Sequence, residues 1–207
     1  MALVVGISQR LVPARGEEVR DSLDQRWTTL LESLGFDPVP LPTLVADPVG
    51  YVVRRGIRAL VLSGGENVPA TGDSPPWNEP RDVFERTLLV WAMANGVPVL
   101  AVCRGFQLVV ADLGGVLRRV DGHAGSMHPL RWSAGEPGPA TVLSHHDWAV
   151  TRLPHSLREV ALATDGTVEA ARHRDLPLLG IMWHPERTPN PDEREHALVS
   201  SALKGLG

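Results

Sequence analysis

The segment LAVCRGFQLV (residues 100–109) contains the only cysteine of the chain, and its pattern decides how the sequence folds. An apolar run leads up to Cys103, and residues with helical spacing follow from Arg104 on. We therefore predict that a buried strand ends at Cys103 and that a helix begins directly after it. Ala101 and Gly105 are small, as the crowding of a sharp strand-to-helix turn requires. Such a turn lifts the thiol clear of the sheet and sets it near a helix N-terminus, which favours a thiolate.

The same alternation of strand and helix extends along the chain. Short apolar runs predict strands over residues 2–7, 39–41, 59–62, 97–102, 116–120, 141–144, 160–163, 168–172 and 178–182. Apolar residues at helical spacing predict helices over residues 21–34, 47–55, 81–95, 104–114 and 192–203. The segment 70–80 is rich in proline and glycine and predicts a loop, and we expect another loop around His123 and His128.

Buried strands separated by helices predict the α/β class. We expect a three-layer sandwich around a mostly parallel central sheet, with a small antiparallel strand region toward the C-terminus. A length of 207 residues suits a single domain covering 1–207. In open α/β sheets, ligands bind at the carboxyl ends of the strands. This rule selects four short segments before any motif is considered: residues 8–10, 63–65, 103–105 and 184–186.

The composition excludes several classes of protein. A net charge of −4 lacks the basic excess of a nucleic-acid-binding protein. A single cysteine excludes an internal disulfide framework and any metal site built from several cysteines. The sequence contains neither a signal-peptide pattern nor the ~20 consecutive apolar residues of a membrane span. We therefore expect a cytoplasmic protein without nucleic-acid or membrane partners.

The role of Cys103 depends on whether a base lies beside it. Free cysteine is often an inert core residue, and a thiol nucleophile needs a histidine that a third group orients. His184 follows a predicted buried strand at the same sheet edge, and Glu186 stands two residues beyond it. His145 and His146 are adjacent on a predicted strand and would point to opposite faces, so we expect no metal site there. The other histidines fall in polar stretches, a predicted loop or the last helix: His123, His128, His155, His173 and His196.

Two glycines follow the strand over residues 59–62. Gly64 and Gly65 would let backbone N–H groups approach a ligand closely. Together with the backbone N–H of Arg104, they could form a two-donor oxyanion hole. An ordinary tight turn explains the glycine pair equally well.

Three motifs, LSGGENV (62–68), AVCRGFQ (101–107) and GIMWHPE (180–186), together resemble the class I glutamine amidotransferase family. The match is closest to its γ-glutamyl hydrolase branch, which acts on amides such as γ-glutamyl-γ-aminobutyrate. RDVFE (81–85) and SHHDWAV (144–150) are also similar to segments of that family. The resemblance spans nearly the whole chain and implies a flavodoxin-like fold, a small-molecule γ-glutamyl substrate and no cofactor.

The resemblance also implies roles for individual residues. Cys103 would attack the amide carbon, His184 would carry the proton, Glu186 would orient His184, and the Gly65 and Arg104 amides would hold the oxyanion. Positions that bind the glutamyl group in relatives are Gly64, Gln107, Ser144 and His145, with Arg20, Asp21 and Asp24 as weaker candidates. The sequence departs from the family at Ala101, which is usually glycine, and at Leu143, where many relatives carry asparagine.

Three functions are compatible with these motifs. The first is a free-standing γ-glutamyl amide hydrolase. The second is a glutaminase subunit that supplies ammonia to a separate synthetase. The third is a binding protein without catalytic activity on the same fold, which the intact Cys103, His184 and Glu186 argue against. The sequence leaves open whether the chain forms a homodimer.

Overall fold

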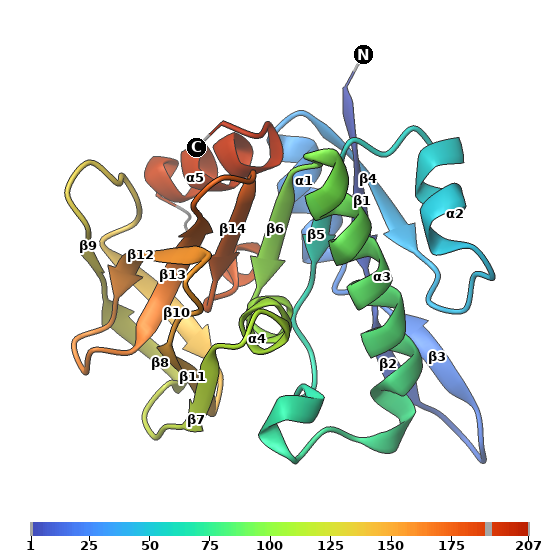
Figure 1. Ribbon diagram of the computed structural model, residues 1–207, viewed down its shortest axis with the longest axis horizontal. Helices are drawn as coiled ribbons and strands as arrows, with labels where there is room; N and C mark the ends of the chain where they lie inside the picture. Colours follow the sequence, from blue (N-terminus) through green and yellow to red (C-terminus); the bar gives the residue numbers. More distant parts are fainter. Residues whose placement is uncertain (1, 189–191, 207) are drawn as a thin grey trace.

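The computed structural model describes residues 2–188 and 192–206, and a long mixed sheet runs through its middle (Figure 1). Five strands of this sheet are parallel and lie in the order β4-β1-β5-β6-β14. They are β1 (Leu3–Ser8), β4 (Phe36–Leu41), β5 (Ala59–Leu62), β6 (Val99–Val102) and β14 (Leu178–Ile181). Counted along the chain, this order is 2-1-3-4-5, which is the flavodoxin-like arrangement.

Antiparallel strands continue the sheet beyond β14. They are β13 (Val168–His173), β11 (Trp148–Arg152) and β7 (Val116–Arg119); β12 (Leu157–Leu162) also pairs with β13, and β9 (Arg131–Trp132) pairs with β12. Two separate antiparallel pairs complete the strands: β8 (Ala124–Pro129) with β10 (Thr141–His145), and β2 (Arg10–Pro13) with β3 (Val19–Ser22).

Helices cover both faces of the parallel strands (Figure 1). Helices α1 (Arg26–Ser33) and α5 (Glu193–Leu203) pack on one face, in the core that contains Val5, Val61 and Leu100. Helices α2 (Pro48–Arg54), α3 (Glu79–Asn95) and α4 (Arg104–Asp112) pack on the other, in the core that contains Leu60 and Leu62. The predicted three-layer α/β sandwich with an antiparallel extension is thereby confirmed.

Strand β4 is an edge strand that carries two prolines. Pro38 lies opposite Val5 and Pro40 opposite Ile7 in the parallel pairing with β1. Because proline has no N–H, alternate residues such as Val39 must supply the donors to β1. The prolines therefore occupy the positions whose backbone faces the open edge, where no ladder bond is lost.

Some predicted boundaries were wrong. The helix predicted over residues 21–34 begins only at Arg26, because residues 19–22 pair with β2 as strand β3. The predicted loop over residues 70–80 contains parts of two short 3₁₀ turns, Pro69–Thr71 and Pro76–Asn78. The loop predicted around His128 is strand β8, because pairing with β10 overrides the local glycine and proline content. In the described part of the chain, every helix is too short or too polar to cross a membrane.

Candidate active site

Cys103 occupies a strained turn between β6 and α4. Its backbone has φ 49° and ψ −106°, and among the described residues it alone takes a positive φ without being glycine. A conformation of this kind costs about 1–3 kcal/mol and persists where surrounding packing enforces it. The first turn of α4 lies very close to the end of β5, so that a Cβ at Gly105 would lie 2.2 Å from the carbonyl oxygen of Leu62. Glycine at this position is thus a steric requirement of the turn.

His184 and Glu186 lie just beyond the carboxyl end of β14. Nδ1 of His184 lies 2.7 Å from Oε1 of Glu186, and both side chains are buried. This pairing leaves Nε2 of His184 as the ring nitrogen available to a thiol. Burial lowers the pKa of His184, but contacts with Cys103 and Glu186 outweigh it and raise the pKa to about 9. This shift favours the protonated imidazole at neutral pH.

The glycine pair after β5 packs closely against two side chains, Gly64 against His184 and Gly65 against Arg81. A Cβ at Gly64 would lie 2.4 Å from Cε1 of His184, and a Cβ at Gly65 would lie 2.4 Å from Nη1 of Arg81. Neither position has room for a side chain. The glycines are therefore needed for close approach, and not only for the turn.

Arg81 fixes the orientation of the backbone in this loop. Its Nη2 donates to the carbonyl oxygens of Ser63, at 2.8 Å, and Gly64, at 3.1 Å. The Gly64 carbonyl and the Gly65 N–H belong to one trans peptide unit and point in opposite directions. The Gly65 N–H is thus directed away from Arg81. Ser8, at the end of β1, anchors the other side of the loop through its Oγ, which accepts from the Ser63 N–H at 2.9 Å.

A buried ion network lies beneath this loop and the elbow. Nε of Arg81 pairs with Oε1 of Glu85 at 2.9 Å, and the Arg104 guanidinium pairs with Glu85 and Asp82. All four side chains are almost fully buried, and their formal charges balance. Burial alone would raise the pKa of Glu85, but Arg104 and Arg81 hold it below its ordinary value. The segment RDVFE (81–85) therefore anchors the first residue of α4 and the glycine loop together.

A cavity of about 170 Å³ opens beside His184. The residues that line it are Arg10, Ser22, Leu23, Asp24, Trp27, Ser63, Gly64, Gly65, His184, Glu186 and Arg187. Cys103 is 5% exposed and lies next to this lining, in contact with His184. The lining includes the side chains of Arg10, Arg187 and Asp24. A hydrogen bond from Arg26 lowers the pKa of Asp24 to about 2, so this carboxyl group is charged at neutral pH. The cavity therefore offers fixed charges of both signs.

The other predicted substrate residues differ in their placement. The ring of His145 lies 6.1 Å from that of His184, between centroids. Gln107 is buried and donates to the Trp148 carbonyl at 3.0 Å, while the buried Ser144 is hydrogen-bonded to His128 at 2.7 Å. Arg20 is exposed, pairs with Glu18 at 2.7 Å and is not part of the cavity lining.

Several lining residues had no individual prediction. Arg10 was predicted only as part of the segment 8–10, which follows a strand. The sequence signal for Trp27 was helical spacing alone, and that for Arg187 was its position next to Glu186. The grouping of His123, His146 and Glu169 was also missed. These residues come from three segments that are distant in the sequence. The expected loop around His123 gave no indication that this residue lies near the other two.

Comparison with known proteins supports the resemblance seen in the motifs. The sequence model of the family described as "Glutamine amidotransferase class-I" matches residues 33–199. The chain is 29% identical to the gamma-glutamyl-CDP-amidate hydrolase of Campylobacter jejuni, over 89% of this chain and 90% of that protein. It is 33% identical to anthranilate synthase component 2 of Thermococcus kodakarensis, over 72% and 76% of the two chains. The crystal structure of a glutamine amidotransferase from Thermotoga maritima has the same fold, with a TM-score of 0.68 at 16% identity over 100% of this chain and 96% of that one.

Proposed function

The chain belongs to the class I glutamine amidotransferase family, and on that basis we propose that it hydrolyses the γ-glutamyl amide bond of a small molecule. The observation that carries the proposal is the juxtaposition of a thiol on a strained elbow with a buried histidine–carboxylate pair. A nucleophile, a base and an orienting group in contact are what covalent acyl transfer requires. Similarity to a γ-glutamyl amide hydrolase over most of both chains supports the choice of substrate class.

In the proposed reaction, the Cys103 thiolate attacks the amide carbon and forms a C–S bond. The carbonyl oxygen becomes an oxyanion, which the N–H groups of Gly65 and Arg104 stabilise. His184 then gives its proton to the amine as the C–N bond breaks, leaving a γ-glutamyl thioester. Water attacks the thioester carbon while His184 takes a proton from that water, and the C–S bond then breaks, which releases glutamate and restores the Cys103 thiolate beside protonated His184. Glu186 holds the imidazole in place through its 2.7 Å contact with Nδ1.

The charges of the cavity fit a glutamyl head group. This group carries an α-carboxylate and an α-ammonium. Arg10 offers a partner for the carboxylate, and Asp24 offers one for the ammonium. His145 lies beside His184 and is proposed to border the same site, with Gln107 and Ser144 supporting its segment. Arg20 has no such support, because it is engaged with Glu18 outside the cavity.

A second candidate is a glutaminase subunit that passes ammonia to a separate synthetase. Similarity to anthranilate synthase component 2, at 33% identity, favours it. The two candidates share the chemistry at Cys103 and differ in whether hydrolysis needs a partner. A binding protein without activity has less support, because Cys103, His184 and Glu186 are all retained and brought together.

Glutamate release separates these functions. The purified chain would be offered glutamine and a panel of γ-glutamyl amides, with Cys103→Ala and His184→Gln as test variants. His155→Gln is a matched control, because His155 is exposed and is not part of the cavity lining. Release from amides without a partner, lost only in the two test variants, supports the hydrolase. Release from glutamine only when a synthetase is added supports the glutaminase role, and equal release by Cys103→Ala refutes the role of the thiol.

A further inference from the structure

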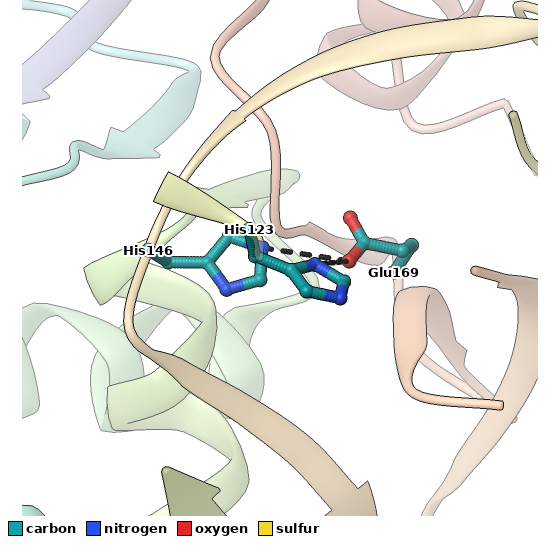
Figure 2. A group of neighbouring side chains, drawn as sticks. All are labelled: His123, His146 and Glu169. Atoms are coloured by element: carbon teal, nitrogen blue, oxygen red, sulfur yellow. Dashed lines mark ion pairs between the residues drawn. The ribbon is translucent and has the colours of Figure 1, made fainter. Parts of the chain in front are cut away.

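A second group of functional side chains lies outside the candidate active site. His123 precedes β8, His146 lies between β10 and β11, and Glu169 is on β13 (Figure 2). All three residues are buried, and their ligand atoms lie within 4.8 Å of one another. Figure 2 shows both imidazole rings facing one oxygen of the Glu169 carboxylate. The proposed amide hydrolysis uses none of these groups.

Most side-chain polar atoms of these three residues lack hydrogen-bond partners within the described chain, the exception being Nε2 of His123. Nδ1 of His123 lies 3.3 Å and Nε2 of His146 lies 3.4 Å from Oε1 of Glu169. These atoms nevertheless form no hydrogen bond within the described chain, and neither does Oε2 of Glu169. Leaving a buried polar atom unpaired costs about 1–3 kcal/mol. Several such atoms converging on one point indicate that something other than a protein group satisfies them.

The distances match those between ligands of a tetrahedral zinc ion. With bonds of about 2.0–2.1 Å, neighbouring ligand atoms on a zinc tetrahedron stand about 3.3 Å apart. The two histidine–carboxylate separations already have this value. The two imidazole nitrogens lie within 4.8 Å of each other, so each would move by less than about 1 Å to close around an ion. His128 lies at the edge of the cluster, with Nε2 3.8 Å from the same carboxylate oxygen, and would reach the fourth position only by giving up its hydrogen bond to Ser144.

The surroundings of His123 also resemble a metal site. Its Nε2 lies 2.8 Å from Oδ2 of Asp165, which leaves Nδ1 facing Glu169. Asp165 is itself held in place by the N–H of Thr167, at 3.0 Å, and by its hydroxyl, at 2.7 Å. Metal-ligating histidines commonly donate their second ring N–H to a carboxylate, which fixes the tautomer and the ring orientation.

We propose that His123, His146 and Glu169 bind a zinc ion, with Asp165 orienting His123 and a water molecule or His128 as the fourth ligand. Imidazole and carboxylate ligands suit zinc, whereas magnesium and calcium prefer oxygen ligands alone. The ion would tie together β13 and the segments that flank β8 and β10. Its role is structural, because it would fix the chain next to Ser144 and His145. The expectation from sequence that no metal binds is revised by this proposal.

A proton is the main alternative to a metal. Contacts with Glu169 and Asp165 raise the pKa of His123 to about 9, so this imidazole could carry a proton and pair with both carboxylates. One proton on His123 would not satisfy His146, neither of whose ring nitrogens has a partner within the described residues. A single zinc ion would satisfy Nδ1 of His123, Nε2 of His146 and Oε1 of Glu169 together.

The test uses the full-length chain with any affinity tag removed, so that no other histidine tract binds metal. Zinc is measured by mass spectrometry in the purified protein, and metal-free protein is then titrated with zinc and, separately, with magnesium. We expect stoichiometric zinc, a zinc-dependent rise in Tm and no response to magnesium. Substitution of zinc by cobalt should give the intense visible absorption of a tetrahedral site. Absence of binding in the wild-type titration overturns the proposal without any variant.

Variants locate the ion. His146→Asn and Glu169→Gln should abolish stoichiometric binding, whereas His155→Asn, at an exposed histidine, should retain it. Asp165→Asn keeps every ligand and changes a half-exposed residue, so it should remain folded while its zinc affinity falls about 10–100-fold. Wild-type affinity in both His146→Asn and Asp165→Asn would overturn the site. These measurements do not involve amide hydrolysis, so their outcome is independent of the proposed function.

Discussion

Replacing Glu85 by glutamine tests the buried ion network beneath the elbow. Glu85 is fully buried and accepts from two arginines, Arg81 through Oε1 and Arg104 through Oε2. Glutamine keeps the shape of the side chain but removes its charge, leaving two buried guanidinium groups with Asp82 as their only carboxylate partner within this network. Breaking a buried pair in this way costs about 3–5 kcal/mol, because the partner charge stays buried. We expect the free energy of unfolding of Glu85→Gln to fall by that amount.

Urea denaturation at neutral pH measures this loss, with a constant m-value as the check on two-state unfolding. Arg86 and Asp112 provide a matched control from the same helix pair, because their salt bridge is partly exposed at 39% and 25%. Asp112→Asn should cost no more than about 1 kcal/mol. The reasoning is refuted if the two variants lose the same stability. It would also be weakened if Glu85→Gln kept full amide hydrolysis, since Arg81 orients the glycine loop.

Three further predictions concern the elbow, the base and a buried acid. Gly105→Ala should lower the free energy of unfolding by about 1–3 kcal/mol, because the new Cβ would lie 2.2 Å from the Leu62 carbonyl oxygen; an unchanged urea midpoint contradicts this. Cys103→Ala removes a contact that raises the pKa of His184 to about 9, so an NMR titration should show that pKa falling toward 6.5, and an unchanged value contradicts the contact. Burial raises the pKa of Glu195 from 4.5 to about 7, so the wild type loses stability as pH rises through this range. Glu195→Gln should therefore match the wild type near pH 4 and exceed it by about 2–3 kcal/mol at pH 8, as thermal unfolding at both pH values would show.

The parallel half of the fold could be predicted from sequence because four of its five strands are largely apolar runs; β4, which contains Asp37 and two prolines, was predicted only in part, over residues 39–41. The elbow at Cys103 was also predictable, since the strand before it and the small Gly105 after it are local signals. The antiparallel half was harder to predict. Strands β2, β3 and β8 are short and largely exposed, so they lack the apolar pattern that marks a strand, and only pairing with a partner defines them.

The components of the candidate site were predictable only in part. His184 and Glu186 stand two residues apart, so their pairing is a local property of the sequence. The four-member ion network is not local, because Arg104 meets Asp82 and Glu85 across two helices. The same holds for His123 and Glu169, which are 46 positions apart in the sequence and meet only through the strand pairing of the folded chain. From the sequence, only the adjacent His145 and His146 were considered as ligands of one metal. The cluster in the folded chain instead joins His146 to residues from two other segments.

The prolines of β4 also restrict how copies of this chain can associate. The open edge of β4 lacks the N–H groups of Pro38 and Pro40, so an incoming strand would find no donors at those two positions. At the far end of the sheet path, β7 presents the exposed charges of Arg118 and Arg119. Neither terminal strand of this path is suited to edge-to-edge growth of a continuous sheet. A homodimer should therefore not form by pairing of β4 or β7 into a continuous sheet, and the protein should resist aggregation by strand addition at these two edges.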